Sequence, residues 1–381
     1  MKNNPKFIIS GGGTGGHIFP AISIANALKA KLPESEILFV GAEGRMEMER
    51  VPAAGYKIIG LPMMGLERKN MLKNFKVLYR SAKSLLKARK IIKEFKPDVA
   101  VGVGGYASGA VLQAANWAGV PTVLQEQNSY AGVTNKLLAK RAKKICVAYE
   151  GMERFFPKEN IILTGNPVRQ DLTAGLDKKA EAYEYFGFSP DKKTILVVGG
   201  SLGARTINQS ILELMKNEEW RMKNQNIQII WQTGKFYFGN IKNELKPVDK
   251  EQGEQFFTLN SSFLITEFVS RMDLAYAIAD LVISRAGASS ISELCLLKKP
   301  VILVPSPNVS EDHQTQNALA LVRKDAAIMV KDAEAVEKLI PEALQLIADD
   351  KKLASLAENI EKLAQHDSAN RIADEIIKLI K

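Results

Sequence analysis

The sequence predicts an α/β fold built from two similar halves, each a parallel sheet with helices on both faces. Both halves open in the same way, with a short apolar strand, a glycine-rich turn and a helix, at residues 7–28 and again at 193–215. Short apolar runs then alternate with helical segments in each half. This alternation is typical of doubly wound parallel sheets, in which crossover helices cover both faces.

In the first half, the apolar strand 7–10 leads into the turn 11–17, and residues 21–28 are predicted to be helical. Pro20 stands near the first turn of that helix, where proline is tolerated. A strand at 36–41 follows, so strand, helix and strand form a βαβ unit of about 30 residues. Further strands are predicted at 98–103, 121–126 and 144–148, with a helix at 109–118.

In the second half, the strand 193–198 leads into the turn 199–205 and a helix from 206 to about 215. Strands are predicted at 227–232, 263–268, 281–284 and 301–304, with helices between them. Residues 333–381 have helical periodicity throughout. The last segment, 369–380, is amphipathic and is able to pack on either half.

Length and composition agree with two soluble domains. A chain of 381 residues with 46% hydrophobic and 25% charged residues can bury two cores. Cys146 and Cys295 lie far apart, which fits a reducing compartment without disulfides or structural zinc. Neither a signal peptide nor a membrane-spanning segment is expected.

The net charge of +10 is concentrated in one segment. Residues 63–96 contain eleven Lys or Arg and two Glu, a local charge of +9. One basic segment indicates one anionic partner surface, whereas nucleic-acid binding usually involves a more widely basic chain. Apolar residues recur at helical spacing in this segment, which fits an ordinary helix packed on the core or a basic amphipathic helix on anionic lipid. We favour a mixture, in which the apolar stripe is partly core and the lysine face, with Met63, Met64 or Leu66 nearby, meets the membrane.

The first glycine turn, GGGTGGH at 11–17, contains the pattern G-x-G-x-x-G after a strand and before a helix, which is a weak signal by itself. Glycines allow the backbone to approach a diphosphate, and the start of the next helix offers N–H groups and the positive end of a dipole. Two alternatives remain for this turn. It is part of a dinucleotide site with Glu43 on the ribose, or it is a tight turn needed only for packing. His17 ends the turn and is either a base for an incoming hydroxyl or a residue that orients the loop.

Three further segments place polar side chains next to predicted strand ends. Ser201 lies in the second glycine turn, where its hydroxyl suits a phosphate, a helix N-cap, or both. Glu293 follows Arg285 by about two helical turns and is able to hold a ribose diol, although the residues alone favour a helix-surface glutamate. Residues 312–318 are dense in hydrogen-bonding side chains after the strand 301–304, although by themselves they favour a solvated loop.

Several motifs occur in one order along nearly the whole chain. They are GGTGGHIFP at 12–20, GGY at 104–106, QEQN at 125–128, GNPVR at 165–169, GGSLGAR at 199–205, TEFV at 266–269 and DHQ at 312–314. Together these motifs resemble the MurG family, the lipid I N-acetylglucosaminyltransferases of bacterial peptidoglycan synthesis.

The resemblance implies a GT-B fold, in which two Rossmann-like doubly wound domains face a cleft. Residues 1–166 would bind acceptor and membrane, with the C-terminal helix 366–381 packing back on them, and residues 167–365 would bind UDP-GlcNAc. The implied reaction is an inverting transfer of GlcNAc to the MurNAc 4-hydroxyl of lipid I, which forms lipid II. The implied location is peripheral, on the cytoplasmic face of the plasma (inner) membrane.

The resemblance also assigns residues to roles. His17, as the base, and Glu126 would be catalytic, and Gly13, Thr14 and Tyr106 would bind the acceptor. The UDP-GlcNAc site would comprise Thr14, Gly15, Gly16, Asn128, Arg169, Ser201, Val269, Ala288, Ser289, Ser290, Ile291, Ser292, Glu293 and Gln314. Among these, Ser201 would meet the diphosphate, Val269 the uracil and Glu293 the ribose.

No cofactor and no metal are expected, because no paired carboxylates stand at a suitable site and a helix dipole can stabilise the departing UDP. The expected partners are UDP-GlcNAc, lipid I, an anionic membrane through residues 63–96, and other cell-wall synthesis proteins. Nucleic acid is not expected as a partner.

The chain departs from the family pattern in places. Gln125 and Ala110 stand where many members have histidine and proline, and 285–290 differs from the common SGALT form. Three alternatives remain: a related GT-B transferase acting on another lipid such as diacylglycerol, an NAD-dependent oxidoreductase, and a non-catalytic membrane or nucleic-acid binder.

Overall fold

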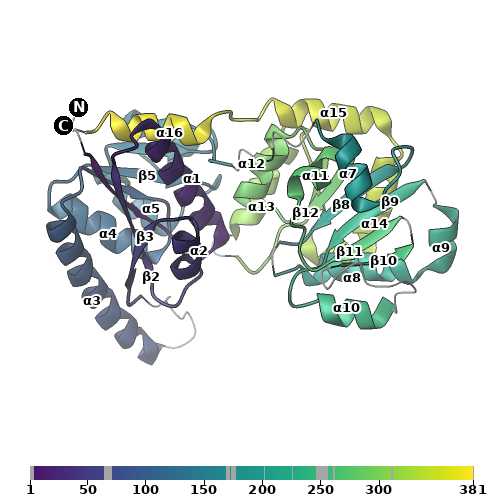
Figure 1. Ribbon diagram of the computed structural model, residues 1–381, viewed down its shortest axis with the longest axis horizontal. Coiled ribbons are helices and arrows are strands. Elements are labelled where there is room, and N and C mark those ends of the chain that lie inside the picture. Colours follow the sequence, from purple (N-terminus) through teal and green to yellow (C-terminus); the bar gives the residue numbers. More distant parts are fainter. Residues whose placement is uncertain are drawn as a thin grey trace. The chain divides into compact units, whose positions relative to one another are not determined.

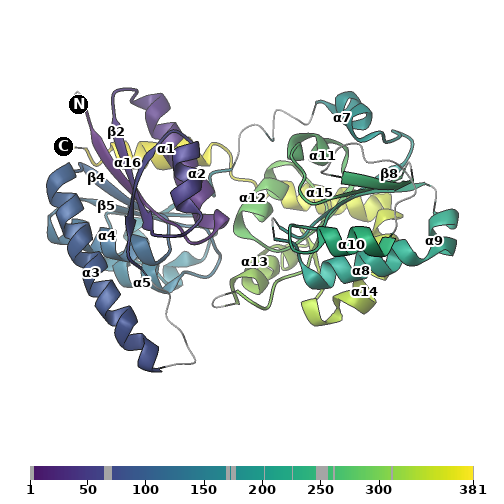
Figure 2. The ribbon, with the colours of Figure 1, turned by 60° about the horizontal axis from the view of Figure 1, so that its bottom comes forward.

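The chain forms two compact units, Met1–Val168 with Gln365–Lys381, and Arg169–Ala364. The computed structural model describes residues 4–63, 71–168, 172, 177–200, 202–224, 226–245, 256–260, 262–309 and 312–380. Each unit contains one seven-stranded sheet with helices on both faces (Figures 1 and 2). The prediction of two doubly wound α/β domains is confirmed.

The first unit is built around a sheet with the order β3-β2-β1-β4-β5-β6-β7. Its strands are β1 (Lys6–Ser10), β2 (Glu36–Ala42), β3 (Lys57–Leu61), β4 (Val99–Gly102), β5 (Thr122–Glu126), β6 (Lys144–Val147) and β7 (Ile161–Leu163). Its helices are α1 (Gly15–Lys31), α2 (Glu47–Ala53), α3 (Met71–Phe95), α4 (Tyr106–Trp117), α5 (Val133–Leu138) and α16 (Ser368–Ile377). Short 3-10 helices are η1 (Ala139–Arg141), η2 (Met152–Arg154) and η3 (Lys158–Asn160).

All neighbouring strands of this first sheet are parallel. Parallel pairing requires crossover connections, which place helices on both faces and bury the strands. The central strands β1 and β4 are accordingly apolar and buried. The strands β3 and β7, which the sequence analysis missed, lie at the two edges, where a short run such as Ile161–Leu163 is only half-buried.

The second unit has the sheet order β10-β11-β9-β8-β12-β13-β14. Its strands are β8 (Lys193–Val198), β9 (Ile227–Gln232), β10 (Phe256–Asn260), β11 (Phe263–Thr266), β12 (Leu281–Ser284), β13 (Val301–Leu303) and β14 (Ile328–Met329). Its helices are α7 (Lys179–Phe186), α8 (Arg205–Lys216), α9 (Glu218–Lys223), α10 (Phe238–Leu245), α11 (Met272–Ile278), α12 (Ala288–Leu296), α13 (His313–Val322), α14 (Ala335–Ile347) and α15 (Asp350–Glu361), with the 3-10 helix η5 (Asp332–Glu334).

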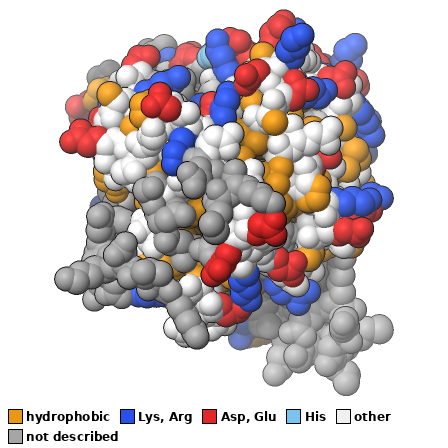
Figure 3. All heavy atoms as spheres, turned by 90° about the vertical axis from the view of Figure 1, so that its right-hand side faces the viewer, with side chains coloured by type: hydrophobic (Ala, Val, Ile, Leu, Met, Phe, Trp, Pro, Cys, Tyr) orange, Lys and Arg blue, Asp and Glu red, His pale blue; other side chains and the backbone are white. Residues whose placement is uncertain are grey.

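One strand pair of the second sheet differs from the expected parallel pattern. Strands β10 and β11 pair antiparallel at the edge of the sheet, with a register shift between Thr258 and Asn260. The link between these strands is too short for the crossover that parallel pairing needs, so the chain turns back as a hairpin. On the face of this unit drawn in Figure 3, basic and acidic side chains are interspersed among the described residues.

Several helix boundaries differ from the sequence-based expectation. Helix α1 begins at Gly15, five residues before Pro20, so the proline lies inside the helix and not in its first turn. Helix α4 begins at Tyr106 and not at 109. The predicted continuous helix at 333–381 is interrupted, because the Asp349 side chain accepts the Lys352 N–H and caps α15, and Asp367 has a left-handed φ of 57°.

The C-terminal helix α16 completes the core of the first unit. Ile372, Ala373 and Ile376 are buried in the same cluster as Phe7 and Ile9 of β1. Helix α16 packs against α1, and the two helices are also joined by an ion pair between Lys31 and Asp374 at 2.8 Å. Within the described residues, no helix combines the length and apolar character needed to cross a bilayer.

The two cysteines are expected to be unreactive in the native protein. Cys146 is 0% and Cys295 is 4% exposed, and burial raises the pKa of each thiol from 9.0 to about 12. Because the thiolate is the reactive form, a disulfide reagent at pH 8 should label neither residue until guanidinium unfolds the chain, when both react. Rapid labelling of native protein would contradict this.

The same shifts set a pH dependence of stability. Each thiol has a higher pKa in the folded than in the unfolded protein. Its contribution to the free energy of unfolding is therefore complete below pH 9 and is lost as the pH rises towards about 12.

Candidate functional site

The two glycine-rich turns lie at equivalent places in the two sheets. In the first sheet the chain moves from β1 outwards to β2 and β3, and then returns to place β4 on the other side of β1. In the second sheet, β8 is flanked by β9 and β12 in the same way. Loops that follow the strands diverge at such a reversal point, so open α/β sheets bind ligands there. The turns after β1 and β8 therefore mark the candidate site of each unit.

The first glycine turn surrounds a buried carboxylate. Glu47, the first residue of α2, is 0% exposed and accepts the Gly13 N–H at 3.0 Å and the Ala42 N–H at 3.0 Å. A Cβ atom on Gly12 would lie 2.1 Å from Glu47 Oε1, so a side chain there would displace the carboxylate. The Gly13 N–H is already used within the fold, and an anion at this turn has to be held by other donors.

Those donors lie at the exposed start of α1. Thr14 is the N-cap residue, with extended backbone and no side-chain cap bond, and both Thr14 and Gly16 are exposed. The first N–H groups of a helix have no partner within the helix, and the dipole of this 17-residue helix favours a negative charge there. The predicted ligand-binding residues Thr14, Gly15 and Gly16 thus occupy an anion-compatible position.

His17 is oriented by the same turn. Its Nδ1 lies 3.1 Å from the Gly12 carbonyl oxygen and 3.4 Å from Thr14 Oγ1. Because a carbonyl oxygen only accepts, the contact with Gly12 favours the tautomer with the proton on Nδ1 and a lone pair on Nε2. Nε2 faces the turn after β4, where a Cβ on Gly104 would lie 2.8 Å away. This is the tautomer that a base acting through Nε2 requires.

Tyr106 and the glycines before it form the other side of this reversal point. Gly104 and Gly105 have φ values of +100° and +86°, which side chains rarely adopt. A Cβ on Gly105 would lie 2.6 Å from the Gly12 carbonyl oxygen, so the two turns are in close contact. Tyr106 begins α4 and is 54% exposed, in a position from which its ring can contact a ligand.

Glu126 is the second residue predicted to be catalytic, and the structure gives its carboxylate four N–H donors. Oε1 accepts from the Asn128 backbone at 3.1 Å and side chain at 3.3 Å, and Oε2 accepts from the Gly132 N–H at 3.0 Å and Asn135 Nδ2 at 2.9 Å. The side chain is 2% exposed. These contacts indicate that Glu126 shapes the loop after β5 and orients Asn128.

A buried amide network continues from this loop. Gln125 Nε2 donates to Asn166 Oδ1 at 3.0 Å, and Asn166 Nδ2 donates to the Gln127 carbonyl at 3.0 Å. Gln127 donates to Gln125 Oε1 and to the Val103 carbonyl. The QEQN and GNPVR motifs are therefore joined by side-chain amides within the first unit. Arg169, predicted to contact the donor, lies outside the described residues.

In the second unit, the glycine turn after β8 is tightly packed. Gly203 has a φ of +85°, and a Cβ there would lie 2.1 Å from the Thr233 carbonyl oxygen. Gln232 bridges neighbouring loops, because its Nε2 donates to Gly200 O at 3.0 Å and its Oε1 accepts the Val269 N–H at 3.2 Å. Val269, predicted to meet a uracil, is thus held by Gln232 beside the turn. Ser201 lies outside the described residues.

The predicted donor-binding segment 288–293 forms the start of α12, after β12. Ser292 Oγ donates to the Ala288 carbonyl at 3.0 Å, and Glu293 Oε2 accepts from the Tyr276 hydroxyl at 3.2 Å. The Ser289 hydroxyl is buried and has no hydrogen-bond partner in the described part of the chain. Ala288 and Ile291 are buried, whereas Ser289, Ser290, Ser292 and Glu293 are half-buried.

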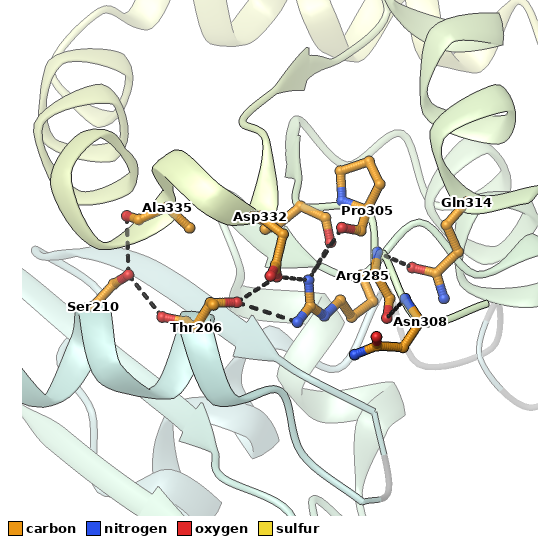
Figure 4. Close-up of polar contacts among 10 residues, drawn as sticks. Thr206, Ser210, Arg285, Pro305, Asn308, Gln314, Asp332 and Ala335 are labelled. Carbon is orange, nitrogen blue, oxygen red and sulfur yellow. Dashed lines mark hydrogen bonds and ion pairs between the residues drawn. The ribbon is translucent and has the colours of Figure 1, made fainter. Parts of the chain in front are cut away.

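Gln314 lies in the first turn of α13 and is half-buried. Its Oε1 accepts the Ser306 N–H at 2.8 Å, and the Ser306 hydroxyl accepts the Asn308 N–H at 3.4 Å (Figure 4). Because the amide oxygen is committed to the loop after β13, the amide NH₂ group is the part of Gln314 that is suited to a ligand.

Arg285 holds together the loops that follow β12 and β13. Its guanidinium donates to the Val304 carbonyl at 3.0 Å and the Pro305 carbonyl at 3.3 Å, and it pairs with Asp332 (Figure 4). Thr206 Oγ1, at the start of α8, contacts both Arg285 and Asp332. This cluster connects three loops at the carboxyl edge of the second sheet.

We expect Arg285→Met to destabilise the second unit by about 3 kcal/mol, because it leaves the Asp332 carboxylate and two carbonyls without their cation. The paired side chains are only 15% and 17% exposed. Denaturant unfolding measures the effect, and Arg323→Met, at an exposed arginine of the same unit, is the control. A loss no larger than that of the control would show that the cluster contributes nothing.

Sequence reasoning did not single out Glu47, Gln127, Gln232 or Asp332 as functional residues. Gln127 lies inside a quoted motif, but the other three lie outside the motifs and carry no signal of their own. In the described part of the chain, no group of three or more His, Cys, Asp or Glu residues is arranged to hold a metal ion.

Comparison with known proteins identifies related sequences for both units. The model of the glycosyltransferase family 28 N-terminal domain matches residues 7–147, and that of the family 28 C-terminal domain matches residues 194–375. A protein of Parabacteroides distasonis is 62% identical over 375 residues, covering 98% of each chain, and one of Bacteroides thetaiotaomicron is 60% identical, covering 100% of this chain and 99% of the relative. Both are named UDP-N-acetylglucosamine–N-acetylmuramyl-(pentapeptide) pyrophosphoryl-undecaprenol N-acetylglucosamine transferase.

Solved structures show the same architecture. The crystal structure of MurG from Acinetobacter baumannii is 25% identical in sequence, with a TM-score of 0.75, and covers 98% of this chain and 99% of that one. The calicheamicin glycosyltransferase CalG4, at 14% identity and a TM-score of 0.67, shares the fold.

Proposed function

This chain belongs to the MurG family of N-acetylglucosamine transferases, and we propose that it transfers GlcNAc from UDP-GlcNAc to the MurNAc 4-hydroxyl of lipid I, which forms lipid II. The observation that carries this function is the family relationship, which extends over both units. The ligand-compatible turns at the reversal point of each sheet support it.

We infer that the second unit binds the donor. The turn after β8 and the start of α8 offer N–H groups and a helix dipole to the UDP diphosphate. Ser201, which lies outside the described residues, would add its hydroxyl. The buried Ser289 hydroxyl needs a partner, since buried polar groups are rarely left unsatisfied, and a donor oxygen would supply one. Val269 would meet the uracil, Glu293 the ribose and the Gln314 NH₂ group the sugar.

On the acceptor side, His17 is the proposed base. In a single displacement, the 4-hydroxyl oxygen attacks the anomeric carbon, the bond from that carbon to the UDP oxygen breaks, and the α-linked donor gives a β-linked product. The hydroxyl proton passes to His17 Nε2, whose lone pair is favoured by the Nδ1 contact with Gly12. UDP leaves with the negative charge, which N–H groups and a helix dipole stabilise without a metal.

The experiment that tests this function is transfer of labelled GlcNAc from UDP-GlcNAc to a soluble lipid I analogue, with diacylglycerol offered in parallel. Formation of the disaccharide product supports the proposal. Labelling of diacylglycerol alone would overturn it in favour of the alternative GT-B transferase.

We further propose that α3 carries the contact with an anionic membrane. Tyr79 and Leu86 are 70% and 66% exposed, and they alternate along one helical face with the exposed residues Lys83, Lys90 and Lys93. Exposed apolar side chains interleaved with lysines are typical of helices that lie on anionic lipid.

A groove beside this helix adds to the same surface. It has a volume of about 580 Å³ and is lined mainly by the end of α3 and by α4. Trp117 is 48% exposed, and the Arg89 guanidinium lies over its ring, 5.1 Å from the centroid. Tryptophan beside arginine suits the interfacial layer of a bilayer, where the ring and the charge meet headgroups. The basic segment 63–96 also includes residues 64–70, which lie outside the described residues.

Neutralising this face should weaken membrane binding by about 100-fold, since each lysine near an anionic surface contributes about 1 kcal/mol. The variant is Lys83→Gln/Lys90→Gln/Lys93→Gln, and cosedimentation with phosphatidylglycerol vesicles measures it. The matched control is Lys331→Gln/Lys351→Gln/Lys352→Gln, at three exposed lysines of the second unit. Equal binding by both triple variants would contradict the proposal, and turnover of a soluble acceptor should be unchanged in both.

A further inference from the structure

Glu47 is a wholly buried carboxylate that lies outside the recognised motifs. It begins α2, yet its oxygens point back to the first glycine turn, where Oε2 accepts the Gly13 N–H and Oε1 the Ala42 N–H. Two glycines make room for it, because a Cβ on Gly12 would lie 2.1 Å from Oε1 and a Cβ on Gly41 would lie 2.6 Å from Cγ. Burying a carboxylate is costly, so two accommodating glycines and two N–H donors indicate a specific role.

The peptide group between Gly12 and Gly13 is held at both ends. Its N–H donates to Glu47 at 3.0 Å, and its carbonyl oxygen accepts from His17 Nδ1 at 3.1 Å. Gly105 also lies close to the Gly12 carbonyl oxygen, because a Cβ on Gly105 would be 2.6 Å from it. One peptide plane therefore connects a buried carboxylate to the imidazole.

This arrangement has a defined electrostatic consequence. A hydrogen bond to a carboxylate is stronger than a neutral one, and it polarises the peptide so that its carbonyl oxygen becomes a better acceptor. A better acceptor holds the Nδ1 proton of His17 more firmly, which fixes the tautomer and the ring orientation. In the serine-protease triad a buried aspartate does this for histidine by direct contact; here the carboxylate would act through one intervening peptide.

We propose that Glu47 is a positioning residue for His17, acting through the Gly12–Gly13 peptide to keep the proton on Nδ1 and the lone pair on Nε2. The inference rests on the proposed function in one respect, namely that His17 accepts the proton of the acceptor hydroxyl. The tautomer itself is a property of the protein without substrate.

The conservative variant Glu47→Gln tests the idea. A glutamine has one oxygen in place of two, so its NH₂ group must face either Gly13 N–H or Ala42 N–H, and the charge is lost. Glu49→Gln, at an exposed glutamate of the same helix, is the matched control. Thermal unfolding and UDP-GlcNAc affinity establish that each variant is folded.

The first readout is spectroscopic. The chain has three histidines, so ring ¹⁵N chemical shifts resolve His17, with His17→Ala for assignment. We expect the wild type and Glu49→Gln to show the Nδ1–H tautomer, and Glu47→Gln to shift towards a mixture of tautomers. An unchanged His17 tautomer in folded Glu47→Gln would overturn the proposal, whatever the activity.

The second readout is a kinetic cycle with the soluble lipid I analogue. We expect Glu47→Gln to lower kcat about 10- to 100-fold, part of the roughly 100- to 10,000-fold that a general base contributes, with little change in the KM for UDP-GlcNAc. The double variant Glu47→Gln/His17→Ala should be no slower than His17→Ala, since Glu47 acts through His17. Multiplied losses in the double variant would identify a separate structural role and overturn the proposal.

A second substitution covers the case in which Glu47→Gln does not fold. Gly12→Ala places a methyl group against Glu47 Oε1 and should displace the carboxylate, with the same change of His17 tautomer. A folded Gly12→Ala protein with the wild-type tautomer would count against the proposal. If His17→Ala keeps full activity while the Glu47 variants still alter the tautomer, the base assignment fails and the positioning role stands.

Discussion

Replacing His17 by alanine is expected to lower kcat for sugar transfer about 100- to 10,000-fold, the range that general-base catalysis contributes. The acceptor hydroxyl is a poor nucleophile while it keeps its proton, and the His17 tautomer favoured by the Gly12 carbonyl presents the Nε2 lone pair for that proton. Initial rates at saturating UDP-GlcNAc and lipid I analogue measure the effect.

The control for His17 is His366→Ala, at an exposed histidine of the same unit, which should leave kcat unchanged. UDP-GlcNAc affinity should also be unchanged in His17→Ala if the donor binds mainly to the second unit. Turnover that survives in folded His17→Ala would remove His17 as the base and leave the transfer activity in place.

Replacing Glu126 by alanine should lower the free energy of unfolding by about 3–5 kcal/mol, the range for removing one partner of a buried charged network. The substitution leaves the N–H groups of Asn128, Gly132 and Asn135 without their acceptor, in a side-chain environment that is 2% exposed. Denaturant unfolding followed by circular dichroism measures the loss. Glu153→Ala, at an exposed glutamate of the first unit, should change it by less than about 0.5 kcal/mol.

The same variant decides between two roles for Glu126. The family resemblance assigns it to catalysis, whereas its contacts assign it to the loop that carries Asn128. A stable Glu126→Ala protein with a collapsed kcat would restore the catalytic role. A destabilised protein whose residual folded fraction turns over normally would establish the structural one.

The strands predicted correctly from the sequence are those that form a clear apolar run of their own. The central strands β1, β4, β8 and β12 are continuous apolar runs, because both faces of a parallel sheet are buried. All four edge strands, β3, β7, β10 and β14, were missed, since an edge strand pairs on one side only and is defined by its single neighbour.

The order of glycine turns and strands also led to the family and to the reversal points. The turns after β1 and β8 follow strands that lie centrally, and the motif set is long enough to be distinctive. The roles of the individual site residues stay predictions, because local motifs do not show which side chains face one another.

By itself, then, the sequence determined the two α/β units, the family and the positions of the two glycine-rich turns, because apolar periodicity and glycine-rich turns are local signals. Only the tertiary structure decided which groups face one another. Glu47 lies 34 residues from Gly13 and Asp332 lies 47 from Arg285, separations with no signature in one sequence. Their contacts form only when the sheet brings its loops to a common edge, where a buried charge requires a partner.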